Sequence, residues 1–60
     1  MSHLIEVLPY AMSGGKIAHY EWPEGEYITV KNGYFVDENE NDFSISPHLI
    51  DDGDWFKVKE

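Results

Sequence analysis

Two tryptophans are the residues of this 60-residue chain best suited to hold a small ligand. Trp22 and Trp55 each follow an acidic residue, Glu21 and Asp54, and each lies beside residues typical of turns. One interpretation is that both indoles fill the core or an interface, since tryptophan is highly buried on average. The other is that both form a wall that stacks a flat ligand such as a nucleobase, at roughly 1–3 kcal/mol per base. Residue type alone favours core packing.

Polar residues near the two tryptophans in the sequence would complete such a ligand site. Asp54 could accept a hydrogen bond from a ribose hydroxyl or from a base edge. Lys16 and His19 could face a phosphate, His19 only when its imidazole is protonated. The stacking interpretation therefore predicts a small, nucleotide-like ligand.

The histidines and the many carboxylates also raise the question of a metal site. His3, His19 and His48 show no close pairing of the kind that places two ligands on one helix face, and the chain has no cysteine. The acidic run at 37–42 lacks the sixth-position glycine and the twelfth-position glutamate of a calcium loop. The sequence therefore predicts neither a metal site nor a bound cofactor, and it favours a solvated acidic loop at 37–42.

Catalysis is not expected. Ser44, Ser46, His48 and Asp54 supply the residue types of a hydrolytic triad, but neither serine has the glycine pattern of a nucleophile elbow. A chain this short also leaves little room for a cleft that excludes water. The GGK sequence at 14–16 lacks the spaced first glycine and the Ser/Thr of a phosphate loop. We therefore expect a protein that is not an enzyme and has no catalytic residues.

Length and composition predict one domain, 1–60, that self-associates. A domain of this size buries only about 60% of the surface of its unfolded chain, so its core is marginal. Disulfides are excluded because there is no cysteine, which leaves assembly into a dimer or tetramer as the expected supplement. The lack of cysteine also fits the reducing cytoplasm.

The charge limits the partners. Twelve acidic residues and four lysines give a net charge of -8, which disfavours binding to nucleic-acid backbones because that requires a basic face. An acidic protein can instead mimic the charge of a nucleic acid. No apolar run approaches the roughly 20 residues that span a bilayer, and the N-terminus is a poor signal peptide, so no membrane partner is expected.

The N-terminal segment predicts a helix that ends at a glycine pair. Ser2 is the expected N-cap, and the predicted buried stripe contains Ile5, Leu8 and Met12, widened by Leu4, Tyr10 and Ala11. Pro9 predicts a kink or two short helical pieces. Gly14 and Gly15 supply the left-handed cap.

The rest of the chain predicts an antiparallel sheet. Strands are expected at 16–22, 26–31, 34–36, 43–45 and 54–59, and a helical turn or a simple turn is expected after Ser46-Pro47. Asn32-Gly33 predicts a type I′ hairpin turn. Alternation places Ile17 and His19 opposite Ala18 and Tyr20, and Trp55 and Lys57 opposite Phe56 and Val58. The predicted fold class is α+β, with one N-terminal helix on an antiparallel sheet of four or five strands.

Segment 4–22 resembles the start of a small phage domain family, that of the second type of Thoeris anti-defence protein. That family begins with an amphipathic helix, continues with a Gly-Lys-Lys-apolar-Ala-Arg strand and then has a tryptophan. The spacing here matches without a gap. The matching positions are Leu4 at the leading aromatic, Leu8 at the helix leucine, Gly14 at the glycine, Ile17 and Ala18 in the strand, and Trp22 at the tryptophan.

The end of the chain is similar to the same family. Residues 46–50 (SPHLI), followed by Asp54 and Trp55, look like its Ser-x-x-Asp-Leu-Leu-Ala-x-Asp-Trp close. His48 stands in place of the aspartate, and there is one extra residue. The two matching segments cover about half of the chain.

The resemblance implies a function. Studied members of the family are phage sponges that form oligomers, bind cyclic ADP-ribose isomers and sometimes cyclic oligonucleotides, and do not degrade them. Two positions depart from the family: His19 replaces an arginine and Gly15 replaces a lysine, and the middle of the chain is shorter. By this resemblance the chain would be a homo-oligomeric anti-defence protein that sequesters a nucleotide-derived immune signal in the host cytoplasm.

The implied site lies between subunits, since one subunit is too small to enclose a ligand. Its implied residues are Trp22 and Trp55 stacking the base, Asp54 and Ser46 bonding to sugar or base, and His19 and Lys16 meeting phosphate. Two alternatives remain. The first is an acidic phage protein that inhibits a host DNA-binding or defence protein by charge mimicry, and the second is a hydrolase of cyclic nucleotides.

Overall fold

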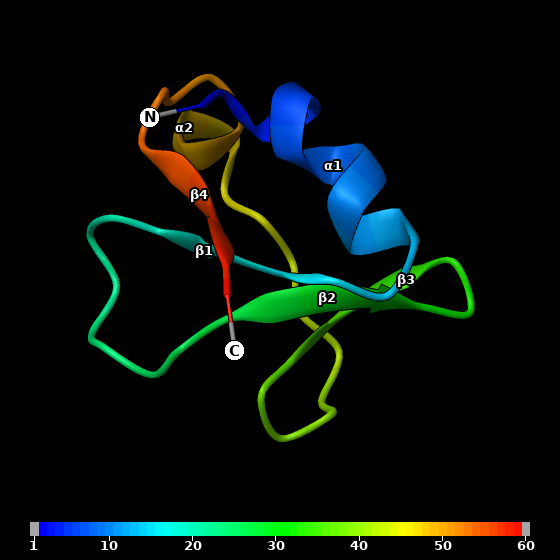
Figure 1. Cartoon of the computed structure of the whole chain (residues 1–60). Helices are drawn as coiled ribbons and strands as arrows, with labels where there is room; N and C mark the ends of the chain where they lie inside the picture. The colour runs from blue at the N-terminus through cyan, green and yellow to red at the C-terminus, as the bar shows by residue number, and fades with distance from the viewer. Residues whose placement is uncertain (1, 60) are drawn as a thin grey trace.

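The computed structural model describes residues 2–59 and places one long helix on a four-stranded antiparallel sheet (Figure 1). The elements are α1 (Leu4–Met12), β1 (Lys16–His19), β2 (Ile28–Lys31), β3 (Tyr34–Asp37), α2 (Pro47–Ile50) and β4 (Trp55–Val58). The sheet order is β3-β2-β1-β4, so β1 pairs with both β2 and the last strand. The predicted α+β fold is confirmed, with four strands rather than five.

Helix α1 continues through Pro9 as one helix, so of the two outcomes expected there, a kink or two short pieces, the second is wrong. A proline removes only one backbone hydrogen bond, and packing of α1 on the sheet offsets that loss. The N-cap is His3 rather than Ser2, and the His3 N–H donates to Glu6 Oε1 over 2.8 Å. The backbone of Ser2 instead pairs with that of Trp55.

The buried face of α1 matches the predicted stripe only in part, at Leu4 and Ala11. Leu4, Val7 and Ala11 are buried, whereas Ile5 is 77% and Met12 66% exposed. Both sets have helical spacing, and they differ by a rotation of one residue, or about 100°. Nearly every position of α1 is apolar, so periodicity alone did not determine which face meets the sheet.

The end of α1 is close-packed against the start of β1. Gly14 has a φ of 97°, as the predicted left-handed cap requires, and its N–H donates to the Ala11 carbonyl over 3.0 Å. Gly15 lies under the ring of Tyr10, where an added Cβ would sit 2.7 Å from Tyr10 Cζ. The hydroxyl of Tyr10 reaches the Val58 carbonyl at 3.4 Å, so this ring links α1 to β4.

Replacing Gly15 by alanine is therefore expected to destabilise the fold by about 1–3 kcal/mol, because the new methyl group displaces the Tyr10 ring. Urea unfolding followed by circular dichroism measures this loss. In a Tyr10→Ala background, the same Gly15→Ala change should cost much less. An equal cost in both backgrounds would show that the overlap with Tyr10 is not the cause.

The two faces of the sheet have different roles. Ile17, Ile28 and Trp55 join the helix residues in one buried core, as the predicted alternation requires for this face. On the opposite face, Ala18 is paired with Phe56. Ala18 is 3% exposed although it faces away from α1, and it lines a pocket together with residues of the 20–27 loop.

Three of the strands are shorter than predicted, whereas β3 extends one residue beyond the predicted 34–36. β1 ends at His19 rather than at residue 22, and β2 begins at Ile28, which leaves 20–27 as a loop. The strand predicted at 43–45 is wrong: backbone pairing is limited to a bridge from Asp42, just before it, to Val36 and a hydrogen bond from the Phe43 N–H to the Phe35 carbonyl over 2.9 Å. Phe43 and Ile45 pack on the edge of the core by their side chains instead. The predicted helical turn after Ser46 forms as α2.

The β2–β3 turn agrees with its prediction. Asn32 and Gly33 have φ values of 55° and 84°, the positive angles that a type I′ turn requires. The following 37–42 loop is fixed to β2 by an ion pair of 2.6 Å between Lys31 Nζ and Glu40 Oε1. The hydrogen bond from Lys31, and then its charge, lower the pKa of the Glu40 carboxyl.

This ion pair predicts a small pH effect. A folded-state pKa below the unfolded value means that the pair stabilises the fold above the ordinary carboxyl pKa and loses this contribution as pH falls through the folded pKa. Carboxyl NMR titration should show Glu40 with a lowered midpoint that rises when Lys31 is replaced by glutamine. A midpoint unchanged in Lys31→Gln would contradict the assignment.

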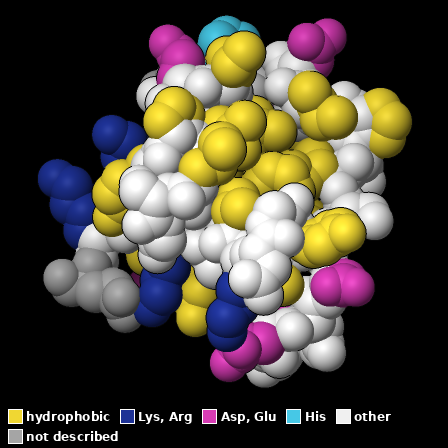
Figure 2. All heavy atoms as spheres, turned by 90° about the vertical axis from the view of Figure 1, so that its right-hand side faces the viewer, with side chains coloured by type: hydrophobic (Ala, Val, Ile, Leu, Met, Phe, Trp, Pro, Cys, Tyr) yellow, Lys and Arg dark blue, Asp and Glu magenta, His cyan; other side chains and the backbone are white. Residues whose placement is uncertain are grey.

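Helix α1 contacts β1, β2, β4 and α2, and among the described residues it makes no comparable contact with β3. The half-buried Phe35 of β3 therefore packs on the core from its side, without helix cover. Figure 2, viewed from the side where α1 and the β2–β3 turn lie, shows a broad area of hydrophobic side chains with acidic groups toward its margins.

Candidate functional site

A pocket of about 380 Å³ lies on the sheet face opposite α1, beneath the 20–27 loop. We call it the Trp22 pocket. Ala18 contributes to its floor, with Phe56 and Val58 from the neighbouring strand, because these residues point away from the core. Its lining residues are Ala18, His19, Tyr20, Trp22, Pro23, Glu24, Gly25, Glu26, Tyr27, Phe56 and Val58.

The walls of the Trp22 pocket are rich in aromatic rings. Besides Trp22, it is lined by Tyr20, Tyr27 and Phe56, of which Tyr20 is 66% and Phe56 38% exposed. Rings of this kind bind flat, apolar groups by stacking. Glu24 and Glu26 on the loop add acceptors that suit amino or hydroxyl groups of a ligand.

A second pocket, of about 320 Å³, adjoins the first, since Tyr27 lines both. We call it the lysine pocket because Lys16 and Lys31 contribute to its walls. Lys16 Nζ lies 4.6 Å from the centre of the Tyr27 ring, a cation–π contact at the boundary between the two pockets. Acidic residues of the 37–42 loop, including Glu40, line its other side.

Trp22 connects the core to the pocket. Its N–H donates to the His19 carbonyl over 3.0 Å, which forms the tight turn after β1. The centre of its ring lies 5.3 Å from that of Trp55 and 5.5 Å from that of Phe43, and both contacts are edge-on. Trp22 remains half-buried, so it is held by the core while also lining the pocket.

Trp55 is a core residue. Its side chain has no exposed surface, and its indole N–H donates to the Leu49 carbonyl over 2.7 Å. The structure does bring the two tryptophans together, but Trp55 has no ring face available to a ligand. The expected stacking role of Trp55 is therefore wrong for the folded chain, and the core-packing interpretation holds for this residue.

His19 is also buried, at 1% exposure. Its Nδ1 accepts a hydrogen bond from the Glu21 N–H over 3.1 Å, and its Nε2 lies 3.1 Å from Asp52 Oδ2. A phosphate in solution cannot reach this imidazole, because the side chain has no exposed surface. The phosphate contact expected for His19 is therefore wrong in this structure.

The other two predicted residues lie outside both pockets. Asp54 is half-buried just before β4, and its carbonyl accepts the Tyr20 N–H over 2.9 Å. Ser46 is exposed at the start of α2, where its carbonyl accepts the Leu49 N–H. The sugar and base contacts expected of Asp54 and Ser46 therefore do not apply to the Trp22 pocket, which retains Trp22 and adjoins Lys16.

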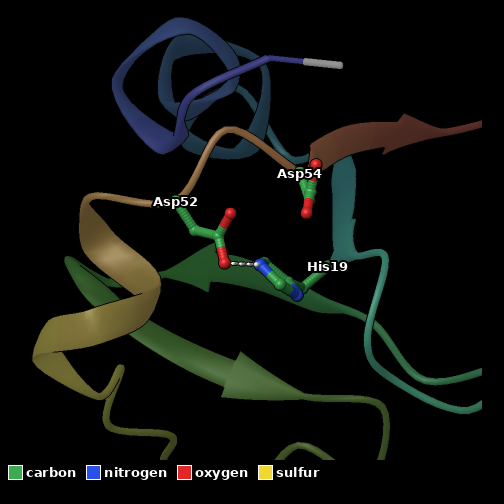
Figure 3. Close-up of side chains that lie close together, drawn as sticks. All are labelled: His19, Asp52 and Asp54. Carbon is green, nitrogen blue, oxygen red and sulfur yellow. Dashed lines mark ion pairs between the residues drawn. The ribbon is translucent and has the colours of Figure 1, made fainter.

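Sequence reasoning missed several residues. Tyr20, Tyr27 and Phe56 could have been found from strand alternation, which turns Tyr20 and Phe56 away from the core. Asp52 had no recognisable signal, because only the folded chain brings it to His19. Figure 3 shows the carboxylates of Asp52 and Asp54 beside the His19 imidazole.

Comparison with models of protein families, with curated proteins and with solved structures finds no match to this chain. Within residues 2–59, no helix has the length and apolar character needed to cross a bilayer.

Proposed function

We propose that this protein is a non-catalytic binding module that takes the flat base of a nucleotide-derived ligand into the Trp22 pocket. The observation that supports it is the junction at Tyr27 of an aromatic pocket and a lysine pocket. A nucleotide has the same two parts, a flat apolar base and an anionic phosphate. The base would stack on Trp22, and the phosphate would extend past Tyr27 toward Lys16.

Size and charge refine this proposal. A volume of about 380 Å³ lies near the lower end of the roughly 300–1,000 Å³ range of small-molecule sites. The net charge of -8 opposes anions at long range, and Lys31 is already paired with Glu40, so the attraction to a phosphate must come from Lys16 at close range. We therefore expect a ligand with few phosphates, whose binding strengthens as added salt screens the repulsion between the acidic surface and the anion.

The resemblance to the Thoeris anti-defence family supports a specific ligand class. It suggests cyclic ADP-ribose isomers or cyclic oligonucleotides, sequestered by a phage protein in the cytoplasm of its host. Sequestration rather than cleavage is proposed because the described pocket walls contain no serine or cysteine, and the imidazole of their one histidine, His19, is buried.

Assembly into a dimer or tetramer is part of the proposal. The apolar area beside α1 and β3 offers a surface that association would remove from water (Figure 2). A partner subunit could also close the Trp22 pocket, which is open to solvent in one chain. Light scattering coupled to size-exclusion chromatography measures the subunit number.

Titration calorimetry with cyclic ADP-ribose isomers and cyclic dinucleotides tests the function. The proposal predicts binding of at least one of them at micromolar protein, with the ligand recovered intact by chromatography. Absence of heat with every compound would exclude the sponge function. Conversion of the ligand, with or without Mg²⁺, would favour the hydrolase alternative.

Charge mimicry is the second candidate function, and the net charge of -8 favours it. A mimic of a nucleic acid would carry its acidic residues in regularly spaced rows, whereas here the exposed acids cluster in loops such as 37–42, which counts against this function. This function predicts salt-sensitive binding to a basic host protein, which pull-down from a host lysate at two salt concentrations would detect.

A further inference from the structure

We propose that His19, Asp52 and Asp54 form a binding site for a divalent transition-metal ion. One ligand atom from each residue lies within 4.8 Å of the other two. His19 ends β1, and the two aspartates flank Gly53 in the turn between α2 and β4 (Figure 3). This site does not depend on the ligand proposed for the Trp22 pocket.

The imidazole of His19 supplies the evidence that this is more than an acidic cluster. Its side chain is fully buried, and its Nε2 has no hydrogen-bond partner. Asp52 Oδ2 is only 3.1 Å away, but it lies off the direction in which an Nε2–H would point. A buried polar atom without a hydrogen bond destabilises the fold, so the lack of a partner for Nε2 requires a physical explanation.

The off-axis position of Asp52 suits a shared metal ion better than a hydrogen bond. Two ligand atoms about 2.1 Å from one ion and 3.1 Å apart subtend about 95° at the ion. This angle lies between the about 90° of adjacent octahedral ligands and the about 109° of tetrahedral ones. The third ligand, up to 4.8 Å away, must close to roughly 3.0–3.4 Å, which rotation of the half-buried Asp54 side chain can supply.

The ligand set selects the kind of ion. One imidazole and two carboxylates match Zn²⁺ and its neighbours, whereas Mg²⁺ and Ca²⁺ prefer oxygen ligands alone. The two carboxylates balance the charge of a divalent ion. The rings of Trp55 and Trp22, centred 5.2 and 6.2 Å from that of His19, exclude water on one side and strengthen the attraction. Asp52, with 27% of its side chain exposed, gives the ion a route from solvent.

Metal binding has a consequence at the other ring nitrogen. A neutral imidazole carries one proton, so an ion on Nε2 requires this proton to be on Nδ1. Nδ1 now accepts the Glu21 N–H, and two donors cannot share that 3.1 Å contact. Binding of the ion must therefore break the hydrogen bond from the Glu21 N–H, which lies in the turn that carries Trp22. Metal binding should change both the Glu21 amide resonance and the tryptophan fluorescence.

Calorimetric titration of the intact protein with Zn²⁺ in a non-chelating buffer tests the site. We expect one ion per chain, a shifted Glu21 amide, and an affinity that falls at least roughly tenfold in Asp52→Asn and in Asp54→Asn. His19→Gln should lose binding in the same way, and the two aspartate variants keep the test valid if that variant fails to fold.

Matched controls separate this site from adventitious surface binding. Asp51→Asn and His48→Gln change exposed residues nearby in the sequence but outside the cluster, and both should retain the wild-type affinity. Absence of Zn²⁺ binding up to about millimolar concentration would overturn the proposal. Zn²⁺ affinity equal to that of the wild type in both Asp52→Asn and Asp54→Asn would overturn it as well. So would Mg²⁺ binding as tight as Zn²⁺ binding.

Discussion

Trp55→Ala is expected to unfold the protein. The variant removes a fully buried indole and its hydrogen bond to the Leu49 carbonyl, at a cost of about 3–5 kcal/mol. A domain of 60 residues has a total stability of roughly 3–9 kcal/mol at the usual 0.05–0.15 kcal/mol per residue. The loss therefore takes between about a third and all of the available stability. Thermal unfolding followed by circular dichroism should show a greatly lowered Tm or no cooperative transition.

Two comparisons make this prediction specific to the core. Trp55→Phe retains much of the ring and should fold with a smaller loss, although Leu49 then loses its donor. Val58→Ala alters a half-buried residue of the same strand and should cost less than Trp55→Ala. A cooperative Trp55→Ala variant with wild-type Tm would contradict the assignment of Trp55 to the core.

Trp22→Ala is expected to leave a folded protein that has lost ligand binding. Trp22 is half-buried and supplies the largest ring of the Trp22 pocket. Loss of one base-stacking contact costs roughly 1–3 kcal/mol, or about 5- to 150-fold in affinity. Calorimetric titration with the ligand that binds the wild type measures this change, and the ligand should be retained better by Trp22→Phe.

A matched variant separates loss of the pocket from loss of stability. Phe43 contacts the same indole at 5.5 Å but lies outside the described walls of the pocket. Phe43→Leu should therefore destabilise the fold while preserving affinity to within a few fold. If Trp22→Ala binds the ligand as tightly as the wild type, the ligand does not stack on Trp22.

Much of the fold could be predicted because local signals were strong. Asn32-Gly33 determined the β2–β3 turn, and the glycine after Ser13 gave the end of α1. The prediction of a fifth strand failed because Phe43 and Ile45 alternate like a strand, yet backbone pairing stops at the Asp42 bridge and one hydrogen bond from the Phe43 N–H to the Phe35 carbonyl. Alternating hydrophobicity does not report whether a neighbouring strand is available.

The orientation of α1 could not be derived from its sequence. Its apolar residues surround most of the helix, so helical spacing fits more than one face. Contacts between residues distant in sequence determine the face: the backbone of Ser2 pairs with that of Trp55, and the Tyr10 hydroxyl donates to the Val58 carbonyl. Such contacts form only in the folded chain, so the sequence of α1 alone does not reveal which of its faces is buried.

The site was predicted only in part, for a related reason. Tryptophans at strand ends suggested two equivalent pocket walls, but pairing of β1 with β4 turns His19 and Trp55 toward α1. Trp22 is only half-buried because β1 ends at His19 and the chain turns immediately after it. The cluster of His19, Asp52 and Asp54 spans a long stretch of sequence, so no short motif could reveal it.

Intermolecular NOEs between a bound ligand and isotope-labelled protein distinguish a base stacked on Trp22 from a ligand held elsewhere. A base in the Trp22 pocket should give NOEs to the rings of Trp22 and Tyr27, and none to the ring of Trp55. The Trp55 indole N–H, bonded to Leu49, should also exchange slowly with solvent. Base contacts to Trp55 without any to Trp22, or contacts confined to another surface, would contradict the account.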